Sequence, residues 1–157
     1  MDNQLQFCTV DEAVEEIRQG RMIIVTDDPG RENEADLIIA AEFATTEAIN
    51  FMVTHARGLV CAPLSPERAD ALQLPLMTSV NRENMSTAFT VSVDAAHDIT
   101  TGISAAERAL TIRTLADPKA TVNDFVQPGH TFPAIRKPPS TSCAWRASSL
   151  PASAVKS

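Results

Sequence analysis

The chain has few cysteines and no long apolar run, and each shortage excludes a class of protein. Its three cysteines, Cys8, Cys61 and Cys143, cannot form a complete set of disulfides, and their spacing fits no zinc-binding template. No apolar run reaches the roughly 18–20 residues that a membrane helix needs. The N-terminal Met-Asp-Asn-Gln lacks the basic start and the apolar stretch of a signal peptide. We therefore expect a cytoplasmic protein with no membrane partner.

Basic residues are also scarce, because 13 Lys and Arg stand against 20 Asp and Glu, for a net charge of −7. Nucleic acids and anionic membranes bind basic patches, so neither is expected as a partner. An anionic substrate held by a few local groups remains compatible with this charge. The sequence also contains no Walker loop, no dinucleotide-binding glycine motif and no G-x-S-x-G nucleophile elbow.

Acidic residues are missing altogether from the last part of the chain. All 20 precede position 125, whereas residues 134–157 carry four of the 13 Lys and Arg, six Ser and three Pro. This segment has little apolar periodicity, and Trp145 is its one aromatic side chain. We expect residues 134–157 to be a disordered tail. Residues 1–133 are long enough to form one domain with a core of its own.

The first 133 residues alternate between helix and strand patterns. Capping boxes predict helix starts at Thr9 and Ser104, and Ser65 before a proline predicts a third. The other expected elements are strands over 22–25, 37–39, 59–62 and 89–93, a helix from Thr45 or Thr46 to Gly58, and an irregular Pro- and Gly-rich segment over 127–133. This order predicts an α/β or α+β domain, in which helices pack on a mixed sheet.

The segment Asp27–Asp36 has the densest group of reactive side chains. It holds five carboxylates and one arginine, Arg31, between two apolar strands. Magnesium prefers carboxylate and water oxygens, and the planar guanidinium suits a phosphate or a carboxylate. In an extended chain Glu32, Glu34 and Asp36 share one face. A calcium loop is excluded because the glycine and the last glutamate are misplaced, while a solvated acidic hairpin remains open.

Two further segments could take part in chemistry. His130 lies in a Pro-Gly-His-Thr-Phe-Pro stretch whose stiff backbone could fix an imidazole for proton transfer. The alternative is an ordinary loop or core histidine, which is how we interpret His55 and His97. Residues 100–108 form a polar loop that enters a capped helix. That loop could bind an anion, or it could simply be a helix cap.

Taken together, these segments resemble one family, the 3,4-dihydroxy-2-butanone 4-phosphate synthases. Asp27-Asp28 followed by Arg31-Glu-Asn-Glu-Ala-Asp36 resembles the family's DDxxRENEGD signature. Gly-Leu-Val-Cys61 resembles its G-[IL]-V-C strand, and the segments 89–93, 100–108 and 128–133 follow in the family's order. Ala35 stands where glycine is usual, and Glu107 where aspartate is usual. The resemblance covers about residues 9–133 and implies the fold of these synthases, incomplete at its C-terminal end.

The resemblance implies an enzyme of riboflavin biosynthesis. Such a lyase converts D-ribulose 5-phosphate into 3,4-dihydroxy-2-butanone 4-phosphate and formate with Mg²⁺ or Mn²⁺, and works as a homodimer. Carried over to this sequence, the resemblance makes Glu32 a metal ligand and a catalytic residue, together with the essential His130 and the nearby Cys61. The substrate contacts that it implies are Arg31, Asp36, Thr101, Ser104 and Arg108.

The resemblance ends after Pro133. The family continues with a glycine-rich loop, a G-H-T-E-A segment whose histidine is the other metal ligand, and a late essential glutamate. None of these appears here, because no Asp or Glu follows Asp124. Residues 134–157 can be assigned codons such that the same DNA, read two bases later, encodes a stretch close to the family's missing segment. We therefore hypothesise that a deletion with a frameshift produced this tail. We expect this chain to be inactive or impaired; alternatively, it could be a non-catalytic partner of an intact synthase.

Overall fold

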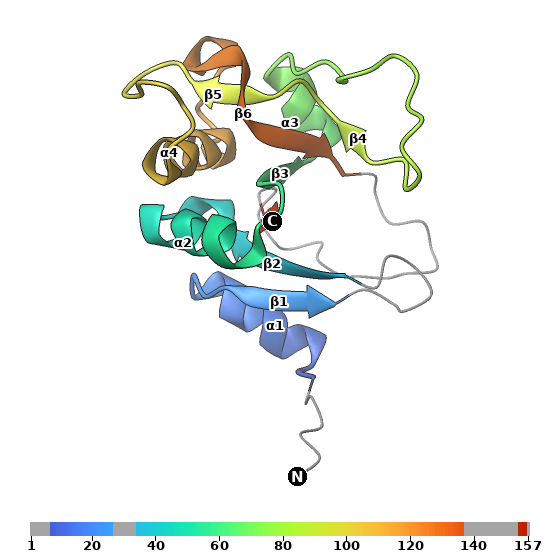
Figure 1. The fold of residues 1–157 in the computed structure, drawn as a ribbon, viewed down its shortest axis with the longest axis vertical. Coiled ribbons are helices and arrows are strands. Elements are labelled where there is room, and N and C mark those ends of the chain that lie inside the picture. Colours follow the sequence, from blue (N-terminus) through green and yellow to red (C-terminus); the bar gives the residue numbers. More distant parts are fainter. Residues whose placement is uncertain (1–6, 27–33, 137–153, 157) are drawn as a thin grey trace.

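The computed structural model describes residues 7–26 and 34–136, and the main chain of 154–156. Helices and strands alternate through these ranges (Figure 1). In chain order the elements are α1 (Val10–Arg18), β1 (Ile23–Thr26), β2 (Ala35–Ala40), the 3₁₀-helix η1 (Ala41–Phe43), α2 (Thr46–Phe51), the π-helix η2 (Met52–Ala56), β3 (Cys61–Leu64), α3 (Pro66–Ala71), β4 (Ala88–Phe89), β5 (Val93–Ala95), α4 (Ala105–Ala116), the 3₁₀-helix η3 (Val122–Asp124), β6 (Phe125–Ile135) and β7 (Ala154–Lys156).

The helix starts follow from local side-chain chemistry, as the sequence predicts. Thr9 and Ser104 each accept a hydrogen bond from the N3 backbone, and Glu12 and Glu107 bond back to the cap residues. Ser65 caps α3 by accepting from the N–H of Arg68. Each such cap is typically worth about 1 kcal/mol. The capping boxes thus fix where α1 and α4 begin, and α4 carries part of the site described below.

The strands form one mixed sheet in the order β1-β2-β7-β3-β6-β4, with β5 pairing to the same strand β6. Strands β3 and β6 are parallel, and the other pairs are antiparallel. In Figure 1, β1 and β2 lie with α1 and α2 in one half of the molecule, and β5 and β6 lie with α4 in the other. The predicted class, helices packed on a mixed sheet, is confirmed.

Helix α4 joins two clusters of buried apolar side chains. Its Ile112 packs with Ile49 and Met52 of the α2–η2 segment. One turn further on, Leu115 packs with Leu64 of β3 and Leu72, which follows α3. All six side chains are at most 1 % exposed, and fully burying one such side chain contributes roughly 1.5–3 kcal/mol. The helix that follows the polar loop 100–108 is therefore anchored along its length.

The prediction of a single strand over 89–93 is wrong. The chain does follow β6 through this region, but β4 ends at Phe89 and β5 begins at Val93. Between them Thr90 forms a bridge with Leu76, and the N–H of Val91 donates to Pro75 at 2.9 Å. The N–H of Thr90 still donates to Pro133 of β6, so the loop before β4 pairs with the other edge of this segment.

The prediction that 127–133 is irregular is also wrong, because these residues lie inside the eleven-residue strand β6. The proline and glycine are accommodated by a shift of register against β5. There Asp94 pairs with Val126, whereas the preceding Val93 pairs with Thr131. Such a bulge tolerates residues that a regular ladder excludes. It also re-aims the side chains within it, which include His130.

Most of the expected tail, residues 134–157, lies outside the described residues. Ala134 and Ile135 complete β6. Ala154–Lys156 form β7, which pairs with β2 on one side and with Cys61 of β3 on the other. Within the described ranges, no helix is both long and apolar enough to cross a membrane.

Candidate active site

His130 is held by the buried carboxylate of Asp94, a residue that lies 36 positions earlier, on β5. Oδ1 of Asp94 accepts from the backbone N–H of His130 at 2.9 Å, and Oδ2 lies 2.7 Å from Nδ1 of the imidazole. The side chain of Asp94 is 6 % exposed and that of His130 is 42 % exposed. The carboxylate is therefore a buried anchor, while the imidazole keeps a face open to solvent.

Two glycines make room for this pair. The amide of Gly129 donates to Ser92, and a Cβ added to Gly129 would lie 2.1 Å from the carbonyl carbon of Val93. Gly102 has a φ of +82°, and a Cβ there would lie 2.0 Å from Oδ2 of Asp94. Only glycine fits where two backbones, or a backbone and a carboxylate, approach so closely. The loop 100–108 and the Pro-Gly-His stretch are thus brought together at Asp94.

Arg108 lies on the first turn of α4 and is the positively charged residue near Asp94. Burial lowers the pKa of its guanidinium, and the charge of Asp94 opposes that shift. Its Nε is buried, and no acceptor among the described residues reaches it. A half-buried guanidinium with an unused donor suits an anionic ligand. The structure therefore places Arg108 and His130 around Asp94, and that both belong to one catalytic site stays a prediction.

The loop before α4 is ordered by Glu107. Its carboxylate accepts from Thr100 and Ser104, and the backbone N–H of Thr100 is the largest cause that lowers the pKa of Glu107 to about 2. The Ser104 hydroxyl donates to Glu107 at 2.9 Å and accepts from its N–H at 3.2 Å. That hydroxyl is thus engaged as a helix cap, and Thr101 beside it is exposed. Whether either one contacts substrate stays a prediction.

Asp36 lies on the sheet at a distance from His130, whereas Cys61 lies on β3, the strand next to β6 that carries His130. One row of paired residues crosses the sheet from β2 to β6: Ile38, Lys156, Cys61 and Phe132. Asp36 and His130 each precede this row by two residues, on parallel strands that are three strand spacings apart. Three spacings correspond to roughly 14 Å. Asp36 and Cys61 are half-buried, and their sequence neighbours belong to the apolar core, so both face away from that core.

Arg31 and Glu32 lie outside the described residues, as do Asp27 and Asp28. Their predicted roles in binding substrate and metal stay predictions. Glu34 is exposed just before β2. In the part of the chain that is described, no group of three or more His, Cys, Asp or Glu side chains is arranged to hold a metal ion.

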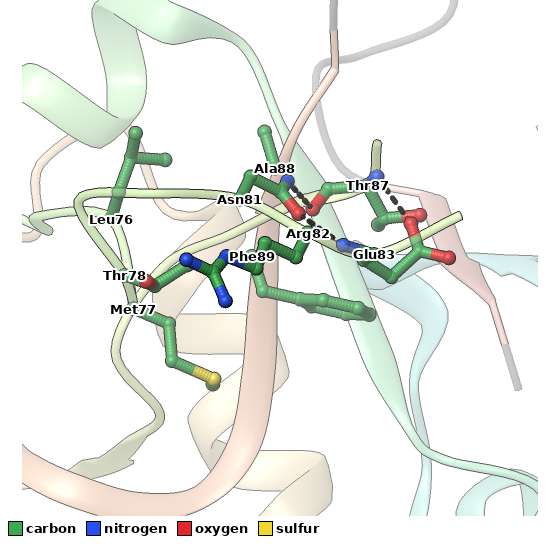
Figure 2. Close-up of a pocket in the computed structure, with 9 residues that line it drawn as sticks. All are labelled: Leu76, Met77, Thr78, Asn81, Arg82, Glu83, Thr87, Ala88 and Phe89. Carbon is green, nitrogen blue, oxygen red and sulfur yellow. Dashed lines mark hydrogen bonds between the residues drawn. The ribbon is translucent and has the colours of Figure 1, made fainter. Parts of the chain in front are cut away.

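The described structure also has a pocket that is formed by a different part of the chain from the predicted site residues. It has a volume of about 290 Å³ and is lined by the loop that precedes β4 and by β4 itself (Figure 2). The loop closes on itself, since Asn81 donates to the carbonyl of Thr87 and Glu83 accepts from the N–H groups of Met85 and Thr87. None of the predicted site residues lines it. We locate the candidate site at His130 because the converging groups are there.

Asp94 is the residue of this site that the sequence-based prediction missed. It is 4 % exposed and lies in a three-residue strand between two buried apolar residues, Val93 and Ala95. A lone carboxylate in an apolar strand is a signal, because an ionised side chain is rarely buried without a partner. The signal does not name the partner, which comes from a strand that follows α4.

Comparison with known proteins confirms the resemblance. A family model for 3,4-dihydroxy-2-butanone 4-phosphate synthase matches residues 11–142, and so reaches past Pro133. The 3,4-dihydroxy-2-butanone 4-phosphate synthase of Pseudomonas aeruginosa is 55 % identical over 133 residues, which are 85 % of this chain and 36 % of the relative. The riboflavin biosynthesis protein RibBA of Aquifex aeolicus is 54 % identical over 137 residues, 86 % of this chain and 34 % of that protein. The chain thus spans about a third of the length of these curated relatives.

Solved structures agree with the sequence comparison. A 3,4-dihydroxy-2-butanone 4-phosphate synthase in complex with two magnesium ions matches with a TM-score of 0.88 and 44 % identity, over 96 % of this chain and 75 % of that one. A cation-free form matches with a TM-score of 0.86 and 44 % identity, over 97 % of this chain and 75 % of that one. The described fold is therefore the fold of these synthases.

Proposed function

Because this chain belongs to the 3,4-dihydroxy-2-butanone 4-phosphate synthase family, we propose that its site acts on D-ribulose 5-phosphate. The products are 3,4-dihydroxy-2-butanone 4-phosphate and formate, in riboflavin biosynthesis. The observation that supports this proposal most is the half-exposed imidazole of His130, fixed by a buried carboxylate beside the guanidinium of Arg108.

The reaction begins with enolisation, which needs a group that removes a hydrogen from a carbon next to the carbonyl. His130 is suited to this step, since an imidazole can both accept and release a proton and its Nδ1 is already engaged by Asp94. Nε2 is then the nitrogen that can accept a proton from substrate. Arg108, with Thr101 and Ser104 before it, is proposed to bind the anionic part of the substrate, and Cys61 to lie close to the site.

A divalent cation, Mg²⁺ or Mn²⁺, is proposed as the cofactor. Glu32 is its proposed ligand, and the neighbouring Glu34 and Asp36 offer the oxygen donors that such hard cations prefer. When bound, the cation supplies a Lewis acid that polarises the vicinal oxygens of the sugar. Asp36 and Arg31 are proposed to orient the substrate beside it.

The remaining proposals concern the whole protein. We propose that residues 1–133 form a partial synthase domain, followed by a tail outside the family pattern, that the protein is cytoplasmic with no nucleic acid or membrane partner, and that it dimerises with itself. We also propose that this chain is impaired and turns over slowly at best, because residues 134–157 depart from the family's pattern.

The test is to incubate the chain with uniformly ¹³C-labelled ribulose 5-phosphate and Mg²⁺ and to follow ¹³C-formate, beside the Pseudomonas aeruginosa relative. We expect slow formate release that disappears in His130→Ala. Formate at the rate of the relative would refute the slow turnover but not the function. An intact fold that neither releases formate nor binds ribulose 5-phosphate would refute the function, and co-purification with an intact synthase would then favour a non-catalytic partner.

A further inference from the structure

We propose that Asp94 is a positioning residue for His130, which fixes the imidazole as the Nδ1–H tautomer so that Nε2 is left as the proton acceptor. This inference rests on the proposed function, because it assigns the proton-transfer atom for the same site. Asp94 itself touches no substrate in this account. It acts through the ring that it holds.

The geometry separates two roles of the same carboxylate. Oδ1 accepts from the backbone N–H of His130 at 2.9 Å, which holds the bulge of β6 in place. Oδ2 lies 2.7 Å from Nδ1 of the ring. An ionised carboxylate only accepts hydrogen bonds, so Nδ1 must be the nitrogen that carries the hydrogen. The neutral ring then has its lone pair on Nε2, on the side that is open to solvent.

The carboxylate of Asp94 is surrounded by polar and positively charged groups. Oδ1 accepts from the backbone N–H of His130, Oδ2 lies against Nδ1 of its ring, and the positive charge of Arg108 acts on the same carboxylate. Gly102 approaches so closely that a Cβ would overlap Oδ2. The carboxylate is thus confined on one side by the loop before α4 and on the other by β6. A buried charge that is satisfied in this way stays in place while the ring changes its protonation.

The proton-transfer step balances simply. The bond between the substrate carbon and its hydrogen breaks, the electron pair remains on the substrate as an enediolate, and the proton moves to Nε2. The imidazolium that forms keeps its Nδ1–H directed at Asp94, whose negative charge stabilises it. No proton moves to Asp94. The carboxylate therefore contributes orientation, tautomer and charge, without taking part in a bond change.

The variant Asp94→Asn separates this role from simple packing. Asparagine has almost the same shape, and its carbonyl can still accept from the backbone N–H of His130. Its NH₂ group then faces Nδ1 and requires a lone pair there, which moves the hydrogen to Nε2. A packing role predicts no change in the tautomer. The positioning role predicts that the tautomer is reversed, with Nε2 no longer able to accept a proton.

The experiment is ¹⁵N NMR of the imidazole rings in the full chain at a pH where they are neutral. The sequence has three histidines, so His130→Ala assigns the signal. We expect Nδ1–H in the wild type, the reversed tautomer in Asp94→Asn, and no change in Asp98→Asn, an exposed control. For turnover we expect kcat to fall at least about 100-fold in Asp94→Asn, with little change in KM.

The wild-type spectrum keeps the proposal testable if Asp94→Asn does not fold. An Nε2–H tautomer in the folded wild type overturns the inference, and so does an unchanged tautomer in a folded Asp94→Asn. An Nδ1–H tautomer together with no response to ribulose 5-phosphate would leave the positioning of His130 standing and refute the proposed function instead. The two failures are therefore distinguishable.

Discussion

Gly102 lies directly against the carboxylate of Asp94, so that a Cβ at this glycine would stand 2.0 Å from Oδ2. The two residues belong to different elements, since Asp94 is on β5 and Gly102 is in the loop before α4. Their contact is what joins the polar loop to the histidine strand, because Asp94 also holds His130. A substitution at Gly102 should therefore move Asp94 and, through it, His130.

We predict that Gly102→Ala displaces Asp94 and releases His130. The added methyl group cannot fit, and a φ of +82° also disfavours alanine. The strain should lower the free energy of unfolding by about 1–3 kcal/mol and shift the imidazole signal of His130. Urea unfolding and NMR measure the two effects.

Gly20→Ala is the matched control for this change, because Gly20 also has a positive φ, of +75°, but faces the ring of Phe43. It should lose stability without affecting His130. A Gly102→Ala protein whose His130 signal matches the wild type would contradict the close contact.

A second prediction concerns the link between α3 and the C-terminal end of α4. The guanidinium of Arg68 donates to the carbonyls of Leu115, Asp117 and Ala120 at 2.6–3.2 Å. Lysine cannot reach three acceptors with one ammonium group. Arg68→Lys should therefore lower the free energy of unfolding by about 2 kcal/mol in urea titrations.

The exposed Arg82 supplies the comparison, since Arg82→Lys should change stability by less than about 0.5 kcal/mol. Equal effects of the two substitutions would show that the three carbonyl contacts of Arg68 contribute nothing specific.

A third prediction uses the depressed pKa of Glu107. The pKa of Glu107 is lowered from its ordinary 4.5 to about 2, because the carboxylate accepts from Thr100 and Ser104. The folded protein thus binds this proton less readily than the unfolded chain does, so the contribution to stability is present above about pH 4.5. It is lost as the pH falls through 4.5 towards 2.

Glu107→Gln tests this pH dependence, because glutamine keeps the shape without the charge. The variant should have a lower Tm than the wild type at pH 7, and the gap should close as the pH is lowered from 5 to 2. The exposed Glu42→Gln should show no such gap. A gap that is constant with pH would mean that the charge of Glu107 does not matter.

The features that the sequence predicts correctly depend on residues close together in the chain. The caps at Thr9 and Ser104 involve a partner three residues away, so they can be predicted without knowing the fold. The assignment of Arg108 and His130 to one site came from the family resemblance and stays a prediction, although the structure places both residues near Asp94.

The features that were missed depend on pairing between distant segments. Pro128 and Gly129 indicate irregular structure locally, yet the bulge against β5 absorbs both within β6. The segment between β4 and β5 bonds to the earlier loop through Val91 and Pro75, a contact that no local pattern records. Asp94 was overlooked for the same reason, because its partner is 36 residues away. Local propensity gives way in each case to the tertiary contacts of the sheet.

The central claim is that His130, held by Asp94, exchanges a proton with ribulose 5-phosphate. The most direct test follows by ¹H NMR how fast the hydrogens next to the substrate carbonyl are replaced by deuterium in D₂O with Mg²⁺. This reports enolisation even if formate is released slowly. We predict exchange with the wild-type chain and a rate at least about 100-fold lower in both His130→Ala and Asp94→Asn. Equal exchange in all three proteins, or none in a folded wild type, would contradict the claim.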